Sequence, residues 1–398
     1  MDIPPRAARP ASFRIIDADT HLSEPVDLWT KRAPASLKDR VPQVKTLGDG
    51  KIAWVIDGDK SIGDGAPANS TIYKDGTKAR NLDFQKLGYD DVHPASYDGK
   101  ARVALLDEIG VWAQIIYPNI MGFGGHKAAL VDAELRLATV KIFNDGMAEL
   151  QAESGDRLCP MAMLPWWDVK EAVRETERAM AMGLKGVNIN SDPQSSRLAE
   201  IEGLPDLGDP HWDPLWEVCQ DKKVPVNFHI GASEQAMDFI GNQGWPSLPH
   251  KLQMGLAGAM VFFNNGRTLG NLIYSGVLDR YPGLQFVSVE SGIGWIPFLL
   301  EALDNQYTEM THRDRLQLMP SEYFQRNFYG CFWFEREDIA HVVRRVGVDR
   351  VMFETDFPHP TCLYPIDNLR EGLPDLTDEE WGKVMGLNAA KLYNIPLG

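Results

Sequence analysis

Eight short, nearly continuous apolar runs recur along the chain. They lie at residues 13–19, 112–119, 159–167, 184–190, 224–230, 284–291, 328–334 and 350–358. Strands that are apolar on both faces are typical of parallel sheets covered by helices. Eight such runs in one chain of 398 residues favour a closed barrel of alternating strands and helices over an open doubly wound sheet.

Helical patterns separate these runs. Apolar side chains recur every three or four residues at 134–153, 171–183, 213–223, 294–310 and 379–393. The glycine run at 122–125 does not have the GxGxxG spacing of a dinucleotide-binding turn, and the sequence contains no GxxxxGK[S/T] loop. We therefore expect an α/β chain that forms one (β/α)₈ TIM barrel domain over residues 1–398.

One long insertion interrupts the alternation after the first strand, at residues 26–99. It contains a predicted β-hairpin at 51–63, with its turn at Asp57-Gly58. Loops of this length inside a compact domain are usually lids or interaction arms. Because the insertion follows the C-terminal end of a strand, we expect it to lie over the barrel mouth.

The charge balance limits the partners. Forty Lys and Arg against 56 Asp and Glu give a formal charge of −16, without a basic run that would bind nucleic acid. No apolar run reaches the ~18 residues that cross a bilayer, and the basic N-terminus lacks the apolar stretch of a secretory signal. The four cysteines form no CxxC pair. We expect a cytoplasmic enzyme with a small-molecule substrate and neither a nucleic-acid nor a membrane partner.

Carboxylate and imidazole side chains stand at the C-terminal ends of four predicted strands, where barrels of this kind assemble their active sites. In the first strand, Asp19 and His21 share one face because alternate residues point the same way. Asp17 lies one step deeper and is expected to orient a ligand. A divalent cation would make such a cluster of like charges tolerable. The candidate metal ligands are Asp19, His21, His229, Glu290, Asp356 and His359.

Each of these residues also has an ordinary structural explanation. A lone buried histidine such as His229 is more often a hydrogen-bonded core residue. Asp356 can cap the turn before Pro358, and Glu290 can lie beside the N-terminus of the next helix. The joint occurrence of ligand-type residues at four strand ends is what favours a metal site.

The same strand ends supply the expected substrate pocket. Its predicted residues are Tyr117, Asn119, Trp166 and Asn190. Aromatic walls with a few amides suit a small aromatic or carboxylated organic molecule. Packing beneath the insertion explains Trp166 equally well, and no basic residue at a strand end identifies an anchor for an anionic substrate.

Several segments, in order, resemble the amidohydrolase-related barrels that include aminocarboxymuconate semialdehyde decarboxylase and γ-resorcylate decarboxylase. They are DADTH, NFHIGA, SVESGIGWIPFLLEALD, FETDFPHP and GLNAAKLY, and the resemblance spans roughly residues 13–394. It implies a metal-dependent enzyme that assembles as a homodimer or higher homo-oligomer. The ligands that it implies are Asp19, His21, His229 and Asp356.

Two positions depart from that family's pattern. Members with decarboxylase or hydrolase activity usually carry a catalytic histidine at the sixth strand, where this chain has Glu290. The carboxylated lysine that bridges two metals in other amidohydrolases has no counterpart here. The fourth strand ends in Asn188 and Asn190, and Lys185 lies at its beginning.

Two reaction classes remain open. In one, a single Zn²⁺ or Mn²⁺ activates water for hydrolysis, or clamps a substrate carboxylate for non-oxidative decarboxylation, and Glu290 is the acid or base. In the other, Glu290 and His359 are catalytic residues that also join the set of metal ligands. Two ions of iron and/or manganese then carry out O₂-dependent hydroxylation, as in the dinuclear iron or manganese–iron hydroxylases of the same superfamily that this set resembles.

We favour the second class, because mixed carboxylate–imidazole ligation explains Glu290 and His359 together. A non-catalytic partner subunit that kept the barrel is a minor alternative, since a fold alone does not guarantee an activity.

Overall fold

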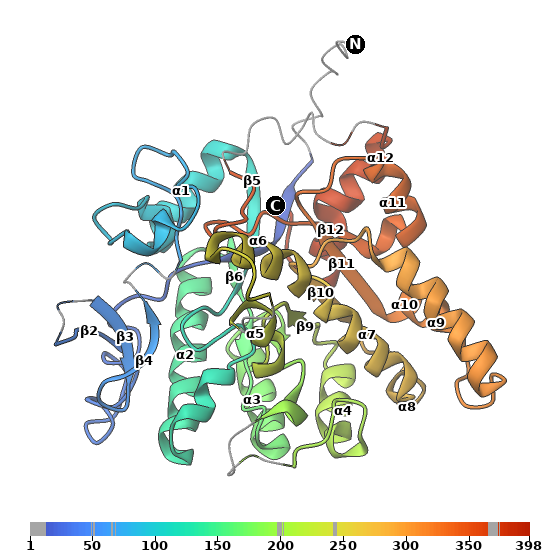
Figure 1. Cartoon of the computed structure of the whole chain (residues 1–398), viewed down its shortest axis with the longest axis horizontal. Helices are drawn as coiled ribbons and strands as arrows, with labels where there is room; N and C mark the ends of the chain where they lie inside the picture. Colours follow the sequence, from blue (N-terminus) through green and yellow to red (C-terminus); the bar gives the residue numbers. More distant parts are fainter. Residues whose placement is uncertain are drawn as a thin grey trace.

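Most strands of the chain form a parallel barrel surrounded by helices, and the strands of the insertion at residues 26–99 form a separate sheet (Figure 1). The computed structural model describes residues 13–398 apart from 49, 51, 65–66, 68, 197–200, 202, 242–244, 365–372 and 374. Each predicted apolar run overlaps a strand, and the third run overlaps two. The barrel strands are β1 (Ile15–His21), β5 (Val111–Tyr117), β6 (Leu158–Pro160), β7 (Ala162–Met163), β8 (Val187–Asn188), β9 (Val226–His229), β10 (Phe286–Val289), β11 (Phe328–Phe332) and β12 (Val351–Phe353).

The third predicted strand changes partners in its middle, which divides the barrel into two hydrogen-bonded sheets. β6 pairs with β5, and β7 pairs with β8. At the change, Met161 N donates to Ile116 O at 2.8 Å and Ala162 N donates to Gly186 O at 3.0 Å. β6 and β7 therefore act as one strand of an eight-stranded barrel.

The barrel closes between the first and last strands. Thr20 forms a parallel bridge with Phe357, and His21 N donates to Phe357 O at 2.8 Å. Asp356 N donates to Asp19 O at 2.9 Å. This closure brings the C-terminal ends of β1 and β12 together, and the (β/α)₈ fold expected from the sequence is confirmed.

Apolar side chains fill the structure both inside and outside the strands. The inner cluster comes from every second strand residue and is continued by the C-terminal segment, with members such as Ile16, Ala18, Ile115, Cys331 and Tyr393. The outer cluster packs the other strand faces against the helices. The near-continuous hydrophobicity of the strands follows from burial on both faces.

The helices cover the outside of the barrel. The five predicted helical patterns are confirmed as α2, α3, α4, α9 and the pair α12–α13, whereas α5 to α8, α10 and α11 were not predicted. Their bounds are α1 (Gly99–Ile109), α2 (Ala133–Glu153), α3 (Val169–Ala181), α4 (Asp213–Asp221), α5 (Glu234–Gly241), α6 (His250–Val261), α7 (Asn264–Tyr274), α8 (Val277–Arg280), α9 (Ile296–Thr311), α10 (Pro320–Asn327), α11 (Ile339–Val346), α12 (Asp378–Gly382) and α13 (Asn388–Leu392). Among the residues described, no helix has the length and hydropathy needed to cross a membrane.

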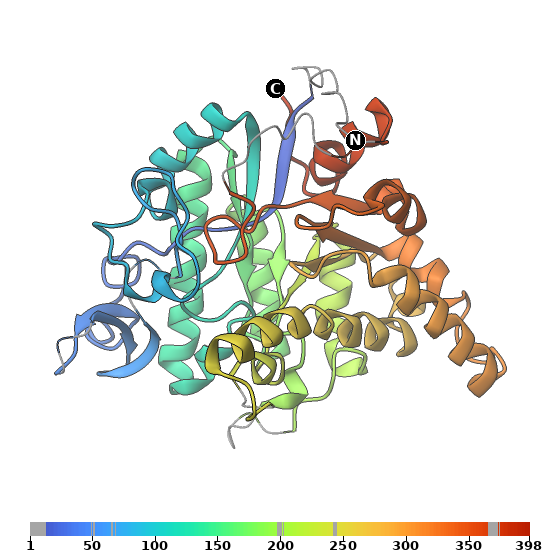
Figure 2. The same cartoon turned by 45° about the horizontal axis from the view of Figure 1, so that its top comes forward.

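The inserted hairpin lies at the side of the barrel rather than over its mouth (Figure 2). β2 (Gln43–Thr46), β3 (Ile52–Ile56) and β4 (Lys60–Asp64) form an antiparallel sheet, with the β3–β4 turn at Asp57-Gly58 as predicted. Trp54 of β3 meets Trp29 edge to face, and Trp29 Nε1 donates to Thr139 O of α2 at 3.0 Å. Lys127 Nζ, in the segment before α2, donates to Ile62 O. Burial of these side chains explains why this part of the insertion lies away from the mouth, over which the whole insertion was expected to lie.

A later part of the insertion does reach the mouth. Thr71 N donates to Pro358 O at 2.9 Å, and Ser23 N donates to Ser96 O at 2.8 Å. Ile72 and Ala95 pack with Phe357 in a small apolar cluster. These contacts join the insertion to the chain that follows β1 and β12; a lid or interaction role for residues 26–99 stays a prediction.

Candidate metal centre

The first strand contributes two side chains to the centre of the barrel mouth. Asp19 and His21 are fully buried and alternate with residues of opposite orientation along β1. His21 Nδ1 lies 3.2 Å from Tyr117 O, so Nδ1 carries the proton and Nε2 offers its lone pair. That Nε2 lies 3.8 Å from Asp19 Oδ1.

The fifth barrel strand, β9, ends in His229, which has the same arrangement. Its Nδ1 lies 2.8 Å from Ile230 O, and its Nε2 lies 3.6 Å from Asp19 Oδ1 and 3.2 Å from Glu290 Oε2. Two imidazole nitrogens from different strands therefore face the same oxygen of Asp19.

Glu290 and Asp356 follow β10 and β12 in left-handed backbone conformations, with φ of 53° and 57°. Such angles are uncommon for residues other than glycine and tend to occur at functional sites. They turn the chain immediately after each strand. Asp356 Oδ1 lies 3.6 Å from His21 Nε2, while Asp356 Oδ2 accepts a hydrogen bond from Thr361 Oγ1 at 2.7 Å.

His359 completes the group from the loop after β12. Its Nδ1 lies 3.3 Å from Asp356 Oδ1, and its ring stacks on His21 with centroids 3.8 Å apart and planes 16° apart. Its Nε2 lies 2.8 Å from Asn119 Oδ1. The six predicted ligands are thus brought together in two groups that share His21. They are Asp19, His21, His229 and Glu290, and His21, Asp356 and His359, with ligand atoms within 4.8 Å of one another.

The donor atoms of this cluster fit a divalent cation. Among the residues described, no hydrogen-bond partner is present for buried Asp19 Oδ1 and Oδ2, His21 Nε2, His229 Nε2, Glu290 Oε2 or Asp356 Oδ1. Buried polar atoms normally have a hydrogen-bond partner. Unpartnered carboxylate oxygens and imidazole nitrogens that converge therefore indicate a binding site for a cation.

The electrostatics of the cluster agree with this. Burial raises the pKa of Asp19 and raises the pKa of Glu290 well above its usual range, and the neighbouring carboxylates add to the rise for Glu290. Burial and the two neighbouring imidazoles lower the pKa of His21 well below its ordinary value. A bound cation would restore the charged carboxylates, while His21 is already in the neutral form that ligates metal.

Asp17 joins neighbouring strands and also contacts a candidate ligand, because its Oδ1 accepts a hydrogen bond from Asp19 N at 3.4 Å. Its expected role in orienting a ligand stays a prediction. Its carboxylate accepts hydrogen bonds from Thr355 N at 2.8 Å, Thr355 Oγ1 at 2.6 Å and Gln114 Nε2 at 3.0 Å. Gln114 in turn accepts from the buried Arg102, which also donates to His21 O at 2.6 Å. Burial raises the pKa of Asp17 to about 7.

The four predicted pocket residues occupy different surroundings. Tyr117 points into the barrel interior, where its hydroxyl donates to Asn227 Oδ1 at 3.0 Å. Asn119 faces His359. Trp166 donates to Gly125 O at 3.0 Å and shares a small cavity with Asn190, between the strands and helices α3 and α4. The structure does not bring these four together, and their contact with a substrate stays a prediction.

Two residues near the centre were not identified from the sequence. Glu354 is fully buried with Oε1 unpartnered, while its Oε2 accepts from Glu290 N at 3.2 Å. Phe123 lies against three of the histidines. The glycines around Phe123 at 122–125 were a usable signal, because glycine marks places where backbones approach closely.

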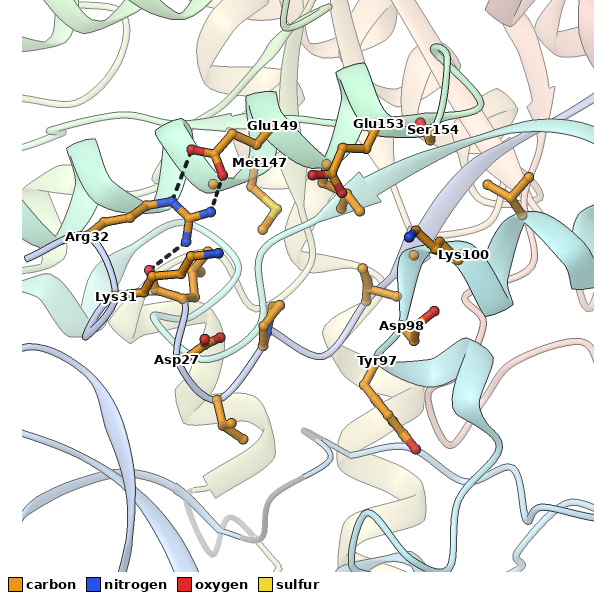
Figure 3. A pocket seen from close by; sticks show the side chains of 18 of the residues that line it. Asp27, Lys31, Arg32, Tyr97, Asp98, Lys100, Met147, Glu149, Glu153 and Ser154 are labelled. Carbon is orange, nitrogen blue, oxygen red and sulfur yellow. Dashed lines mark hydrogen bonds and ion pairs between the residues drawn. The ribbon is translucent and has the colours of Figure 1, made fainter.

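A large cavity of about 750 Å³ lies apart from this centre, between the start of the insertion, α1 and α2 (Figure 3). Among its described lining residues are Leu22, Tyr97 and Met147, and none of the six predicted ligands is included. Figure 3 shows Arg32 facing Glu149 of α2, to which it is ion-paired. The chemistry of the ligand cluster, rather than cavity size, therefore locates the candidate active site.

Comparisons with known proteins agree on the family. The Amidohydrolase family model matches residues 16–395. A γ-resorcylate decarboxylase from Polaromonas sp. (strain JS666) is 27% identical over 298 residues, which cover 72% of this chain and 86% of that protein. The crystal structure of an amidohydrolase from Mycobacterium avium subsp. paratuberculosis K-10 is 25% identical with a TM-score of 0.74, covering 97% of this chain and 98% of that one.

A third comparison concerns metal content. The structure of a dihydroxybenzoic acid decarboxylase from Polaromonas sp. JS666, solved with bound manganese and the inhibitor 2-nitroresorcinol, has a TM-score of 0.60 at 19% identity. The alignment covers 96% of this chain and 97% of that one. At this identity the likeness concerns the fold.

Proposed function

Because this chain belongs to the amidohydrolase family, we propose that it is a metal-dependent lyase that removes carbon dioxide from a small aromatic carboxylate without an oxidant. The observation that carries the proposal is the convergence of six buried carboxylate and imidazole side chains, with unpartnered donor atoms, at the barrel mouth. The decarboxylase relatives support this reaction over the hydroxylation that the sequence favoured.

The residues of the centre suit the two requirements of decarboxylation. Asp19, His21, His229 and Asp356 would hold a divalent ion, which would supply positive charge against the anionic oxygens of the substrate. Glu290, whose pKa burial raises well above its usual range, would be the proton donor, and its Oε2 lies 3.2 Å from His229 Nε2. The bond between ring carbon and carboxylate breaks, its electron pair stays on the ring carbon, and that carbon takes the Glu290 proton as carbon dioxide leaves.

The direct test is carbon dioxide release from 2,6-dihydroxybenzoate and related hydroxybenzoates by the manganese-loaded protein. Equal rates with and without O₂ are expected, with one decarboxylated ring formed per carbon dioxide. Absence of carbon dioxide release over the whole panel would contradict the proposal.

Oxygen-dependent hydroxylation at two iron or manganese ions is the second candidate. It is favoured by the division of the ligands into two overlapping groups, which place Glu290 among the donors of one group and His359 among those of the other. Two metal ions per chain in anaerobically purified protein, together with O₂ uptake, would support it. One ion per chain without O₂ uptake would exclude it.

The variant Glu290→Gln separates the two functions. As an acid in the lyase, Glu290 is needed for turnover but not for metal, so the variant should keep its metal content and lose activity by about two to four orders of magnitude. As a ligand, the same residue is needed for metal, and the variant should lose metal. Metal analysis beside turnover of the same preparation distinguishes these results.

A further inference from the structure

Phe123 covers the imidazole side of the metal centre. Its ring centroid lies 4.4 Å from that of His229, 5.1 Å from that of His21 and 5.8 Å from that of His359. It stands in the loop after β5, at the mouth of the barrel. Phe123 is half-buried, whereas the three histidines are buried, so it forms the outer layer over them.

Close contacts between the loops after β5 and β9 hold this ring in position. The Asn188 side chain donates to Phe123 O. A Cβ added to Gly124 would lie 1.9 Å from Ala232 O, and one added to Gly231 would lie 3.2 Å from the Phe123 ring. The glycines therefore allow the loops after β5 and β9 to approach closely enough to hold Phe123 over His229.

An aromatic ring in this place has two physical effects. It replaces water beside the ligand imidazoles with an apolar surface, which strengthens electrostatic interactions at the centre. It also offers a π-face on which a planar ring packs more favourably than an aliphatic chain of similar size.

We propose that Phe123 is the aromatic wall of the substrate site, which limits the access of water to the metal and selects planar aromatic acids over aliphatic ones. The selection of an aromatic acid rests on the proposed function. The limit on water access does not, because it follows from the contacts with the three histidines.

Water access is tested with Mn²⁺ alone as the ligand. Phe123→Ala, Phe123→Leu and wild type are loaded with Mn²⁺, and metal content and the water proton relaxation rate per bound ion are measured. Phe298→Ala is the matched control, because Phe298 on α9 is 76% exposed. We expect unchanged metal content throughout, and a relaxation enhancement that rises clearly in Phe123→Ala but stays near the wild-type value in Phe123→Leu, which keeps the bulk.

Selection is tested by titrating the same proteins with 2,6-dihydroxybenzoate and with cyclohexanecarboxylate. Phe123→Ala and Phe123→Leu should both bind the aromatic acid about tenfold more weakly, with little change for the aliphatic one.

Two results would overturn the proposal. The first is wild-type relaxation in Phe123→Ala together with wild-type binding. The second is loss of Mn²⁺ from Phe123→Ala with retention in Phe123→Leu, since the ring would then only support the histidines. Failure of the wild type to bind any aromatic acid would reject the proposed substrate class, while the relaxation rates would still decide the covering role.

Discussion

Each histidine of the centre commits one ring nitrogen to a protein acceptor and turns the other toward the carboxylates. For His21 and His229 the acceptors are the main-chain oxygens of Tyr117 and Ile230. For His359 it is the side chain of Asn119, whose amide orientation is set because Asn119 Nδ2 donates to Leu22 O at 3.0 Å. The nitrogen that each histidine turns toward the carboxylates is therefore fixed by a hydrogen bond from the other ring nitrogen to a residue outside the cluster.

Asn119→Leu tests this arrangement. The variant removes the acceptor of His359 Nε2, so the imidazole loses its fixed orientation toward Asp356. Metal affinity should fall about 10- to 100-fold, as for other residues that orient a ligand, and competition with a chelator measures it. Asn119→Asp keeps an oxygen acceptor for His359 but places its second oxygen against Leu22 O, so its metal affinity should fall less than that of Asn119→Leu. Equal affinities in Asn119→Leu and wild type would show that the hydrogen bond does not position His359.

At the scale of whole elements, the site depends on how the first and last strands meet. β1 carries Asp19 and His21, and the segment after β12 carries Asp356. The side chain of Asp17 joins them through both the main chain and the hydroxyl of Thr355. The contact between β1 and the segment after β12, the seam of the barrel, therefore also brings together candidate ligands from opposite ends of the sequence.

Asp17→Asn should weaken that seam without removing a ligand. An amide nitrogen in place of one carboxylate oxygen faces donors from Thr355 and Gln114 and leaves them unsatisfied. A loss of about 1–3 kcal/mol in the free energy of unfolding is expected. Urea unfolding of the metal-free protein measures it, with Asp59→Asn as the control, because Asp59 is exposed and its ion pair with Lys45 is worth little. A loss equal to that of the control would contradict the role of Asp17.

The sequence predicted the strands and their ends well, because burial on both faces leaves a continuous apolar run, and strand-end residues of a barrel must converge. It did not predict several helices, among them α5 to α8. In α6, for example, the pattern was hard to recognise because the helix is apolar around most of its circumference and contains Gly255 and Gly258. It placed Tyr117 at the mouth, although its hydroxyl lies deep in the barrel against Asn227. Phe123 was missed because its place depends on contacts between loops far apart in the sequence.

On the scale of the whole molecule, the barrel is built around acidic groups that burial keeps from ionising. The pKa values of Asp19, Glu290 and Glu354 are all raised, chiefly by burial, and the pKa of Asp17 is raised to about 7 from 3.8. Because each of these pKa values is raised by folding, the groups bind protons more tightly in the folded metal-free protein than in the unfolded chain. Their contribution to stability therefore falls as the pH rises from about 4 to about 7.

Metal binding should reverse this dependence. Binding needs an ionised Asp19, whose pKa burial raises, so a proton must leave as the ion enters, and the equilibrium favours the ion more strongly at higher pH. His21 does not oppose this, because its lowered pKa means that it is already neutral. The rise in Tm on adding Mn²⁺ should therefore grow as the pH increases above the usual range for a carboxyl group. Calorimetric titration in buffers of different ionisation enthalpy should show proton release, and a pH-independent Tm shift with proton uptake would mean that the buried carboxylates do not hold the ion.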